Sequence, residues 1–459
     1  MLALLLPLSG CILLGPDYER PRFSLPSFFR SAPPPAAAPL TVPAHWWRLY
    51  GDKTLEELVT AGLVKNADVR LAMARIQEAE ATLREANATF LPPIDLDVTA
   101  GRTRSSTATG TLPPGSPVIR NNFLLSASTS FEVDFWGRLR RIRESARAQY
   151  AATRYARDVV ALTLAAGIAQ SYFSLRSLDA QIALSEETLT ASGESLELTR
   201  RRARAGLVSD LDVNQAATVR AQLAAQVKDL RRQRAVVEHQ LGILSGTLDV
   251  ALPPGNVLEL PMPPLPPPGL PSTLLERRPD VRQAEAQLMA ANAQIGAARA
   301  AQLPTISLTG SGGVQSRELS NLFSTGATIW SIGAGAVGPL LDWGRSAART
   351  EQAEARAQQA AVVYEQTAQT AFREVSDALS NTALAADAEQ DLRERVDQAR
   401  NTLRLATLRY DSGYSGYLEV LDAQRTLNDA QLALVRNRQA YLAYTVDLMN
   451  ALGGGWVSD

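Results

Sequence analysis

The chain has 459 residues, more than one ordinary hydrophobic core contains, so we expect several layers or domains. Its formal net charge of −1 argues against a protein that binds nucleic acid or another polyanion. Hydrophobic residues make up 46% of the chain but aromatic residues only 6%, and this alanine- and leucine-rich composition favours long, closely packed helices. One cysteine and two histidines provide little material for a metal cluster or a nucleophile–base pair, so we expect no metal, no cofactor and no catalytic residue.

The N-terminal residues are typical of a cleaved signal. Residues 1–10 are apolar and too short to span a bilayer permanently. The run Leu8-Ser9-Gly10-Cys11 is similar to a bacterial lipobox, which predicts a signal peptide over residues 1–10 and a lipidated Cys11. The alternative is an ordinary secretory signal with a chance cysteine, and the absence of Lys or Arg before the apolar run is a departure from the usual pattern.

A proline-, alanine- and serine-rich segment follows and predicts an N-terminal tether over residues 11–52, anchored by its lipid. Within it, the motif Gly15-Pro-Asp-Tyr-Glu-Arg-Pro21 stands out from its surroundings. Helical spacing then begins at about Lys53, which opens the first of two repeats, predicted at residues 53–252.

Strand-like alternation interrupts the helices twice. Apolar and polar residues alternate over about 94–106 and 122–135, with a polar loop between them, which predicts two strands that each have one polar face. The second half of the chain supplies two more strands, at about 304–315 and 327–341. These strands are long enough to cross a bilayer when tilted.

Two long helical hairpins are the clearest sign of an internal duplication. The segment Gly206–Ala216 matches Gly413–Ala423 without a gap, 207 residues later, and matching heptad seams with alternating steps of four and three precede both copies. We therefore predict hairpins over 137–252 and 342–452 that turn at these glycines. A proline-rich linker at 253–271 separates the first repeat from the second, predicted at 272–459.

Four strands cannot close a barrel, and an open sheet edge is not viable in lipid. The strands of several copies must therefore combine, and three copies of four strands would give twelve. The sequence thus predicts a mostly α-helical protomer of helix–strand–helix repeats. Its trimer would form a 12-stranded membrane β-barrel that continues into a long α-helical barrel.

The chain resembles the TolC-like outer membrane factor family, in particular its OprM/NodT-like lipoprotein branch that serves RND multidrug efflux pumps. The resemblance covers essentially the whole chain and rests on these motifs: Leu8–Cys11, Gly15–Pro21, Arg278–Arg282, Ala291–Arg299 and Leu421–Gln424. It implies a homotrimeric duct in the outer membrane with a large periplasmic part. It also implies a periplasmic membrane-fusion adaptor and an inner-membrane RND transporter as partners, besides outer-membrane lipid.

The resemblance also implies a periplasmic gate formed by Tyr410, Leu418 and Asp422. The two repeats differ here, because Tyr410 stands where the first has Ala203 and Asp422 where it has Gln215. Three Leu418 side chains would form an apolar constriction and three Asp422 carboxylates a ring that favours cations. We expect the Tyr410 hydroxyl to bond a carboxylate on a neighbouring helix. Alternatively, all three are ordinary helix residues.

The hairpin ends are the predicted contact surface for the adaptor. Acidic residues there also have a plain structural explanation, because Ser209–Asp212 fits a helix capping pattern and acids are stabilised near a helix N-terminus. The predicted tip residues are Gly206, Leu207, Val208, Asp210, Asp212, Gly413, Tyr414 and Glu419.

Three other functions stay open. An ABC-type (type I) secretion system uses a similar outer-membrane component. A lipid-anchored coiled-coil structural protein would explain the heptads but not four two-faced strands, and a stand-alone porin would explain the strands but not the hairpins.

Overall fold

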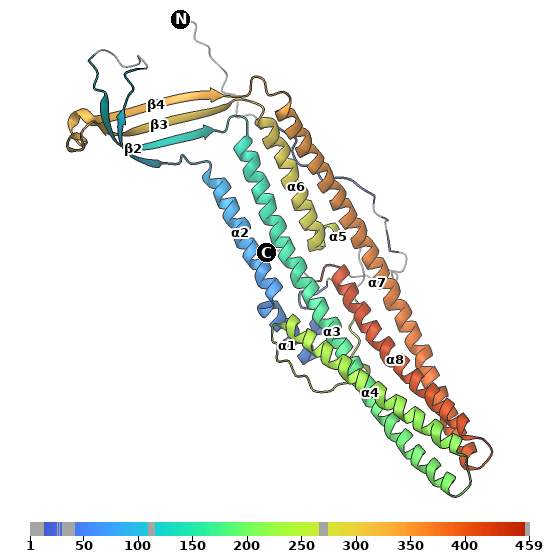
Figure 1. The fold of residues 1–459 in the computed structure, drawn as a ribbon. Helices are drawn as coiled ribbons and strands as arrows, with labels where there is room; N and C mark the ends of the chain where they lie inside the picture. The colour runs from blue at the N-terminus through green and yellow to red at the C-terminus, as the bar shows by residue number, and fades with distance from the viewer. Residues whose placement is uncertain are drawn as a thin grey trace. The chain divides into compact units, whose positions relative to one another are not determined.

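The structure is a computed structural model that describes residues 13–24, 26, 28–29, 42–108, 115–265 and 274–454 (Figure 1). The predicted signal peptide and Cys11 lie outside the described residues.

The 3-10 helices are η1 (Trp46–Tyr50), η2 (Val257–Glu259), η4 (Leu319–Asn321) and η5 (Thr325–Ala327). The strands are β1 (Asp95–Arg104), β2 (Ile119–Val133), β3 (Thr305–Ser316) and β4 (Thr328–Val337). The α-helices are α1 (Lys53–Lys65), α2 (Ala67–Ala88), α3 (Arg138–Arg204), α4 (Asp210–Ser245), α5 (Leu274–Arg277), α6 (Pro279–Ala300), α7 (Arg345–Asp411) and α8 (Tyr417–Ala451).

The chain divides into two compact units, and neither unit coincides with a sequence repeat. Unit 1 comprises Met1–Arg22, Ile76–Thr153 and Ala284–Tyr364, and unit 2 comprises Phe23–Arg75, Arg154–Gln283 and Glu365–Asp459. Helices α2, α3, α6 and α7 each contribute residues to both units. The predicted repeats therefore describe the duplication of the sequence, whereas each unit buries its apolar residues with segments from both halves of the chain.

Unit 1 contains one antiparallel sheet in the order β1-β2-β3-β4 (Figure 1). Its register places Val98 opposite Leu125, Leu125 opposite Val314, and Val314 opposite Thr328. Because successive side chains of a strand point to opposite faces, one face collects the large apolar residues. They are Leu96, Val98, Phe123, Leu125, Phe131, Ile306, Leu308, Val314, Trp330 and Ile332.

The opposite face of the sheet is mostly polar, as the alternation predicted. Ser128 Oγ donates to Asp97 Oδ2 over 2.9 Å, and the hydroxyls of Ser311 and Ser331 lie 2.8 Å apart. Several apolar side chains on the other face are highly exposed in the single chain, for example Leu96 at 71% and Ile332 at 84%. An exposed apolar face on a sheet with a polar back is typical of a wall between lipid and a water-filled lumen.

The outer strands β1 and β4 each pair with one strand only among the described residues, so both edges of the sheet are open. Two strand limits differ from the sequence prediction by more than two residues. Strand β2 begins at Ile119 rather than 122, and β4 ends at Val337 rather than 341. The early end of β4 has a simple cause, because Pro339 lacks the N–H group that a sheet ladder requires.

The predicted tether is bound to unit 1 near its start. Tyr18 Oη donates to Glu285 Oε1 over 3.0 Å. Arg20 binds the same carboxylate through two bonds, of 2.6 Å from Nε and 2.9 Å from Nη2. The guanidinium of Arg141, which is 2% exposed, donates to the carbonyl oxygen of Leu14 over 3.0 Å. The motif Gly15–Pro21 therefore attaches the N-terminal segment to α3 and α6.

The end of the predicted tether is a core element of unit 2, so the prediction of a free tether up to residue 52 is wrong. Trp46 and Tyr50 of η1 are fully buried, and the hydroxyls of Tyr50 and Thr445 lie 2.7 Å apart. Asp52 caps α1 through the Leu55 N–H. Composition indicated a linker here, but three large aromatic side chains in η1 bury enough apolar surface to order it.

One described helix, α3, contains a window long and apolar enough to cross a membrane, and 44% of that window is buried within the chain. Residues Leu164, Ile168 and Phe173 of α3 lie in the core of unit 2 beside the η1 aromatics. Core packing therefore explains the apolar residues of this part of α3.

Residues 253–265, the described part of the proline-rich linker, are bonded to helices of both hairpins. The Gly255 N–H donates to Asp179 Oδ2 of α3 over 3.1 Å. Arg438 of α8 donates to the Leu260 carbonyl oxygen over 2.6 Å. The linker therefore joins the α3–α4 hairpin to the α7–α8 hairpin within unit 2.

The motif Arg278–Arg282 has a similar structural role at the start of α6. The buried Arg278 guanidinium binds both carboxylate oxygens of Asp280. It also forms an ion pair of 2.7 Å with Glu374 of α7 and donates to the Ala451 carbonyl oxygen at the end of α8. One charged side chain thus connects three helices of unit 2.

Candidate functional site

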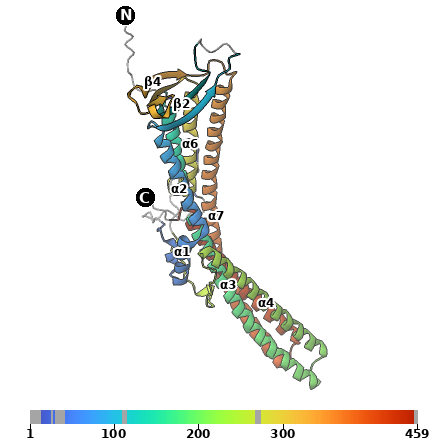
Figure 2. The same cartoon turned by 60° about the vertical axis from the view of Figure 1, so that its left-hand side comes forward.

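The turns of the two hairpins lie at the same end of unit 2 in both views (Figure 1, Figure 2). They share one backbone geometry. Gly206 and Gly413 have φ values of 73° and 78°, in the left-handed region that favours glycine. The N–H of the residue after each glycine reaches five residues back over 2.9 Å, from Leu207 to Arg202 and from Tyr414 to Arg409. Both helices therefore end in the same glycine-based cap, and the turns agree with the sequence match.

The helices that follow the turns begin differently. Ser209 precedes α4, and both its N–H and its hydroxyl bond to Asp212 Oδ2, over 3.1 and 3.0 Å. This contact confirms the predicted capping role of Asp212. Gly416 precedes α8 and has no side chain to cap it, and Glu419 instead lies 3.4 Å from Arg409 Nε at the end of α7. The second turn therefore depends on an exposed ion pair, which stabilises little.

Tyr410 is the predicted gate residue with the most extensive contacts in the chain. It lies near the end of α7 and is 9% exposed. The guanidinium carbon of Arg202, from α3, lies 4.6 Å from the centroid of the Tyr410 ring. Arg202 Nη2 also donates to Asp411 Oδ1 over 3.2 Å. One arginine of the first hairpin thus contacts two successive residues of the second.

The expected bond from the Tyr410 hydroxyl to a carboxylate is not formed within the part of the chain that the structure describes. The hydroxyl is buried and makes no hydrogen bond of normal geometry there, although its interaction with Arg202 raises the pKa of that guanidinium. Tyr410 is therefore held within the protomer by its ring, through a cation–π contact and apolar packing.

Tyr417 extends this contact between the hairpins. It is 3% exposed, its ring centroid lies 5.3 Å from that of Tyr410, and its hydroxyl is hydrogen-bonded to Ser195 of α3. Burial raises the pKa of the Tyr417 hydroxyl, so it stays protonated. We call these five residues the tip cluster: Ser195, Arg202, Tyr410, Asp411 and Tyr417.

Sequence reasoning missed four members of the tip cluster, namely Ser195, Arg202, Asp411 and Tyr417. The arginine run Arg200–Arg204 was a visible signal, because repeated cations near a helix end need carboxylate or aromatic partners. Which of these arginines meets Tyr410 depends on the rotation of α3 against α7, and spacing alone does not fix that rotation.

The other predicted gate residues are exposed in the single chain. Leu418 is 64% exposed and Asp422 is also on the surface, where it has no ion-pair partner among the described residues. Leu207 and Tyr414, at the two turns, are 73% and 80% exposed. Gly206 and Val208 lie on the first turn, while Asp210 and Glu419 lie in the first turns of α4 and α8. The cluster thus holds the hairpins together from within, while Leu418, Asp422 and the turn residues are free to meet other chains.

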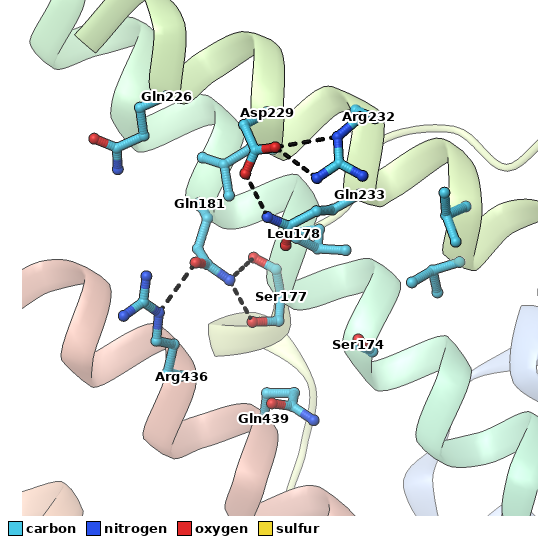
Figure 3. Close-up of a pocket in the computed structure, with 13 residues that line it drawn as sticks. Ser174, Ser177, Leu178, Gln181, Gln226, Asp229, Arg232, Gln233, Arg436 and Gln439 are labelled. Carbon is cyan, nitrogen blue, oxygen red and sulfur yellow. Dashed lines mark hydrogen bonds and ion pairs between the residues drawn. The ribbon is translucent and has the colours of Figure 1, made fainter. Parts of the chain in front are cut away.

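A polar groove of about 680 Å³ lies between α3, α4 and α8 (Figure 3). Gln181 in its floor donates to Ser177 Oγ over 3.1 Å and accepts from Arg436 Nε over 3.3 Å. Asp229 on its wall accepts hydrogen bonds from Arg232 and Gln233, and these bonds lower the pKa of its carboxyl. Because this space separates the helices, the hairpins are not packed tightly along their whole length.

The described residues contain no group of three or more His, Cys, Asp or Glu side chains that could hold a metal ion. The molecule instead offers a two-faced strand wall and paired hairpins with matching turns. An apolar-faced strand wall together with long helical hairpins is typical of a membrane channel protein.

Comparison with known proteins identifies the channel class. The family model for outer membrane efflux proteins matches residues 58–247 and 270–454. Solvent efflux pump outer membrane protein SrpC of Pseudomonas putida is 36% identical over 473 residues, which cover 98% of this chain and 97% of the relative. Cation efflux system protein CusC of Escherichia coli is 34% identical over 456 residues, which cover 98% and 97%.

Solved structures agree with the sequence relatives. A crystal structure of CusC superposes with a TM-score of 0.86 at 32% identity, over 96% of this chain and all of the other. The outer-membrane channel OprN gives a TM-score of 0.88 at 29% identity, over 97% of this chain and 99% of the other.

The chain belongs to the outer membrane efflux protein family. It is therefore an outer-membrane component of an efflux system, with a large periplasmic part. Proteins of this family are transport conduits rather than enzymes.

Proposed function

We propose that three copies of this chain form the exit duct of a tripartite efflux pump. A periplasmic adaptor and an inner-membrane RND transporter deliver the cargo, and the duct conducts it passively across the periplasm and the outer membrane. The observation that carries the proposal is the four-stranded sheet with one apolar face and two open edges. Open edges are not viable in lipid, and three copies supply twelve strands, enough to close a barrel.

The dimensions of the apolar face support a membrane wall. On β2 it extends from Phe123 to Val133, ten residue steps. At about 3.3 Å per residue and a tilt of about 40°, these steps give an apolar height of about 25 Å, the usual value for outer-membrane barrels. A lipid-anchored coiled-coil structural protein would have no use for such an apolar face.

Small-molecule efflux is favoured over protein secretion by the relatives. SrpC and CusC carry names for solvent and cation efflux, and two other relatives at 36% identity are a toluene efflux pump protein and an antibiotic efflux pump protein of Pseudomonas putida. The choice of an RND transporter as the partner rests on the resemblance of the sequence motifs to the branch that serves RND pumps. Co-purification of the intact chain with an RND-type adaptor, and not with the adaptor of an ABC exporter, tests this choice.

The gate follows from the asymmetry of the two turns. Leu418 would form an apolar ring at the axis and Asp422 a ring of negative charge. The tip cluster would hold α7–α8 against α3–α4 in the closed state, and the exposed turn residues would meet the adaptor. Support comes from the contact of Arg202 with Tyr410 and Asp411, which joins the two hairpins at their ends.

The lipid anchor is the last part of the proposal. The run Leu8–Cys11 supports a lipidated Cys11 as the mature N-terminus. Leu14 donates its N–H to the Trp136 carbonyl oxygen, three residues after β2 ends at Val133. The described chain therefore begins near the helix-side end of the strand wall. Mass spectrometry of the mature N-terminus tests the lipidation of Cys11, and an unmodified N-terminus elsewhere would contradict it.

Single-channel recording tests the duct itself. The purified chain should migrate as a trimer in detergent and conduct ions after reconstitution in a planar bilayer. A monodisperse monomer that retains its β-sheet circular dichroism signal would overturn the trimer.

A further inference from the structure

Charge is segregated along the strands of the sheet. The four strands contain three acidic residues, Asp95, Asp97 and Glu132, and all three lie in the part of the sheet from which the helices extend. Glu132 is neutralised there by Arg138 at the start of α3. The three arginines in the strands lie at the opposite end, on the β1–β2 hairpin. They are Arg102, Arg104 and Arg120.

Two of these arginines are on the apolar face. Alternation along β1 places Arg102 and Arg104 on the face that carries Leu96 and Val98. Both side chains are exposed, and neither has a hydrogen-bond or ion-pair partner within the described ranges. Arg120 is opposite Thr103 and so belongs to the polar face, where its Nε donates to the Pro117 carbonyl oxygen.

The register gives the height of the outward arginines. Arg102 is opposite Asn121, two residues beyond Phe123, where the continuous apolar run of β2 begins. Arg104 is opposite Ile119, a single apolar residue beyond that run. Two residue steps correspond to about 7 Å along the strand and about 5 Å along the membrane normal. The guanidinium groups therefore lie just outside the hydrocarbon layer, at the depth of lipid headgroups.

The headgroups at this end belong to the outer leaflet, because the helices extend from the other end of the strands into the periplasm. Guanidinium groups bind phosphate through paired hydrogen bonds, and a basic side chain near an anionic membrane surface is attracted to it. We infer that Arg102 and Arg104 form a binding site for the phosphate groups of a phosphorylated glycolipid, of the lipid A type, in the outer leaflet. The inference rests on the proposed duct only for the direction of the barrel in the membrane.

Native mass spectrometry of the full-length trimer in detergent tests the site. The probes are bisphosphorylated lipid A and the same lipid after enzymatic removal of its phosphates. We expect the wild-type protein to retain the phosphorylated form at roughly tenfold lower concentration than the dephosphorylated form. The double variant R102Q/R104Q should lose this preference, R102K/R104K should keep part of it, and the inward control R120Q should keep it in full.

Equal retention of both lipids by the wild-type protein would overturn the inference, and this comparison does not depend on any variant folding. An equal loss of the lipid preference in R120Q would also overturn the inference. Displacement of lipid A by an equimolar amount of inorganic phosphate would overturn it too, because it would indicate a site for free phosphate. Conductance of the same preparations separates the two proposals. A trimer that selects phosphorylated lipid A but does not conduct contradicts the duct and leaves the lipid site intact.

Discussion

The guanidinium carbon of Arg202 lies 4.6 Å from the ring centroid of Tyr410, and this contact joins the end of α3 to the end of α7. The same side chain forms an ion pair with Asp411. A cation–π contact stabilises by about 0.5–2 kcal/mol, depending on its exposure. In a threefold assembly the contact occurs three times, so its loss changes the balance between closed and open tips substantially.

Arg202→Gln should therefore open the resting channel. Glutamine removes the charge that binds both Tyr410 and Asp411, and we expect a several-fold higher open probability in single-channel recordings and greater entry of vancomycin into cells. Arg200→Gln is the matched control, because Arg200 pairs with Glu197 on its own helix. Equal leak in both variants would show that general loss of charge, not the tip cluster, opens the channel.

Tyr410 offers a sharper test because its ring and its hydroxyl have different surroundings. The hydroxyl makes no hydrogen bond of normal geometry in the described chain, so Tyr410→Phe should leave the closed state nearly unchanged, within about 0.5 kcal/mol. Tyr410→Ala removes the ring that Arg202 contacts and should open the channel as Arg202→Gln does. If Tyr410→Phe and Tyr410→Ala open the channel equally, the hydroxyl makes a bond in the assembly that the single chain does not show.

Asp422 tests the other half of the gate. Asp422→Ala should reduce the preference of the channel for cations, because it removes three exposed carboxylates from the proposed ring. Ion selectivity is read from the reversal potential in a salt gradient. Substitution of Gln215, the equivalent residue of the first hairpin, should leave selectivity unchanged. A selectivity change of equal size at Gln215 would contradict an asymmetric gate.

Substitution of either turn glycine should destabilise the folded protein by the same amount. No atom lies within 4 Å of a Cβ built on Gly206 or Gly413, so only the backbone conformation opposes a side chain. Gly206→Ala and Gly413→Ala should each lower the free energy of unfolding by about 1 kcal/mol. Chemical denaturation followed by circular dichroism measures both. A large loss at one turn only would mean that the single-chain turns are not equivalent in the assembly.

The carboxyl of Asp447 should make the folding stability of unit 2 depend on pH. Burial raises the pKa of its carboxyl and Glu374 adds to the effect, while a hydrogen bond from Gln170 opposes it. A raised pKa in the folded state means that the carboxyl favours folding when protonated, at low pH. This stability is lost as the pH rises through the folded-state pKa. Asp447→Asn should therefore raise the melting temperature at pH 7 by roughly 1–2 °C.

The advantage of Asp447→Asn should shrink as the pH falls, because the wild-type carboxyl then becomes neutral as well. Thermal unfolding between pH 4 and pH 8 measures the trend. Asp429→Asn, an exposed position on the same helix, is the control and should change little. A constant difference between Asp447→Asn and wild type across this range would mean that the ionisation of Asp447 does not contribute.

Periodic signals in the sequence predicted the elements that depend on local spacing. The alternation around Leu125 predicted a strand, and the repeated glycines predicted turns at Gly206 and Gly413. Contacts between distant segments were not visible in this way. Glu285 lies 265 residues from Arg20, and nothing in either segment alone indicates the pair. Trp46 was assigned to a tether because composition describes the average of a segment, whereas a few aromatic side chains are enough to order it.

Single-channel recording of the reconstituted wild-type protein and of Arg202→Gln tests the central claim most directly. The account predicts discrete conductance steps from a trimer that is mostly closed at rest, and a several-fold higher open probability for Arg202→Gln under the same conditions. Folded protein that inserts into the bilayer but shows no conductance steps, in wild type and variant alike, would contradict the claim that this chain forms a duct.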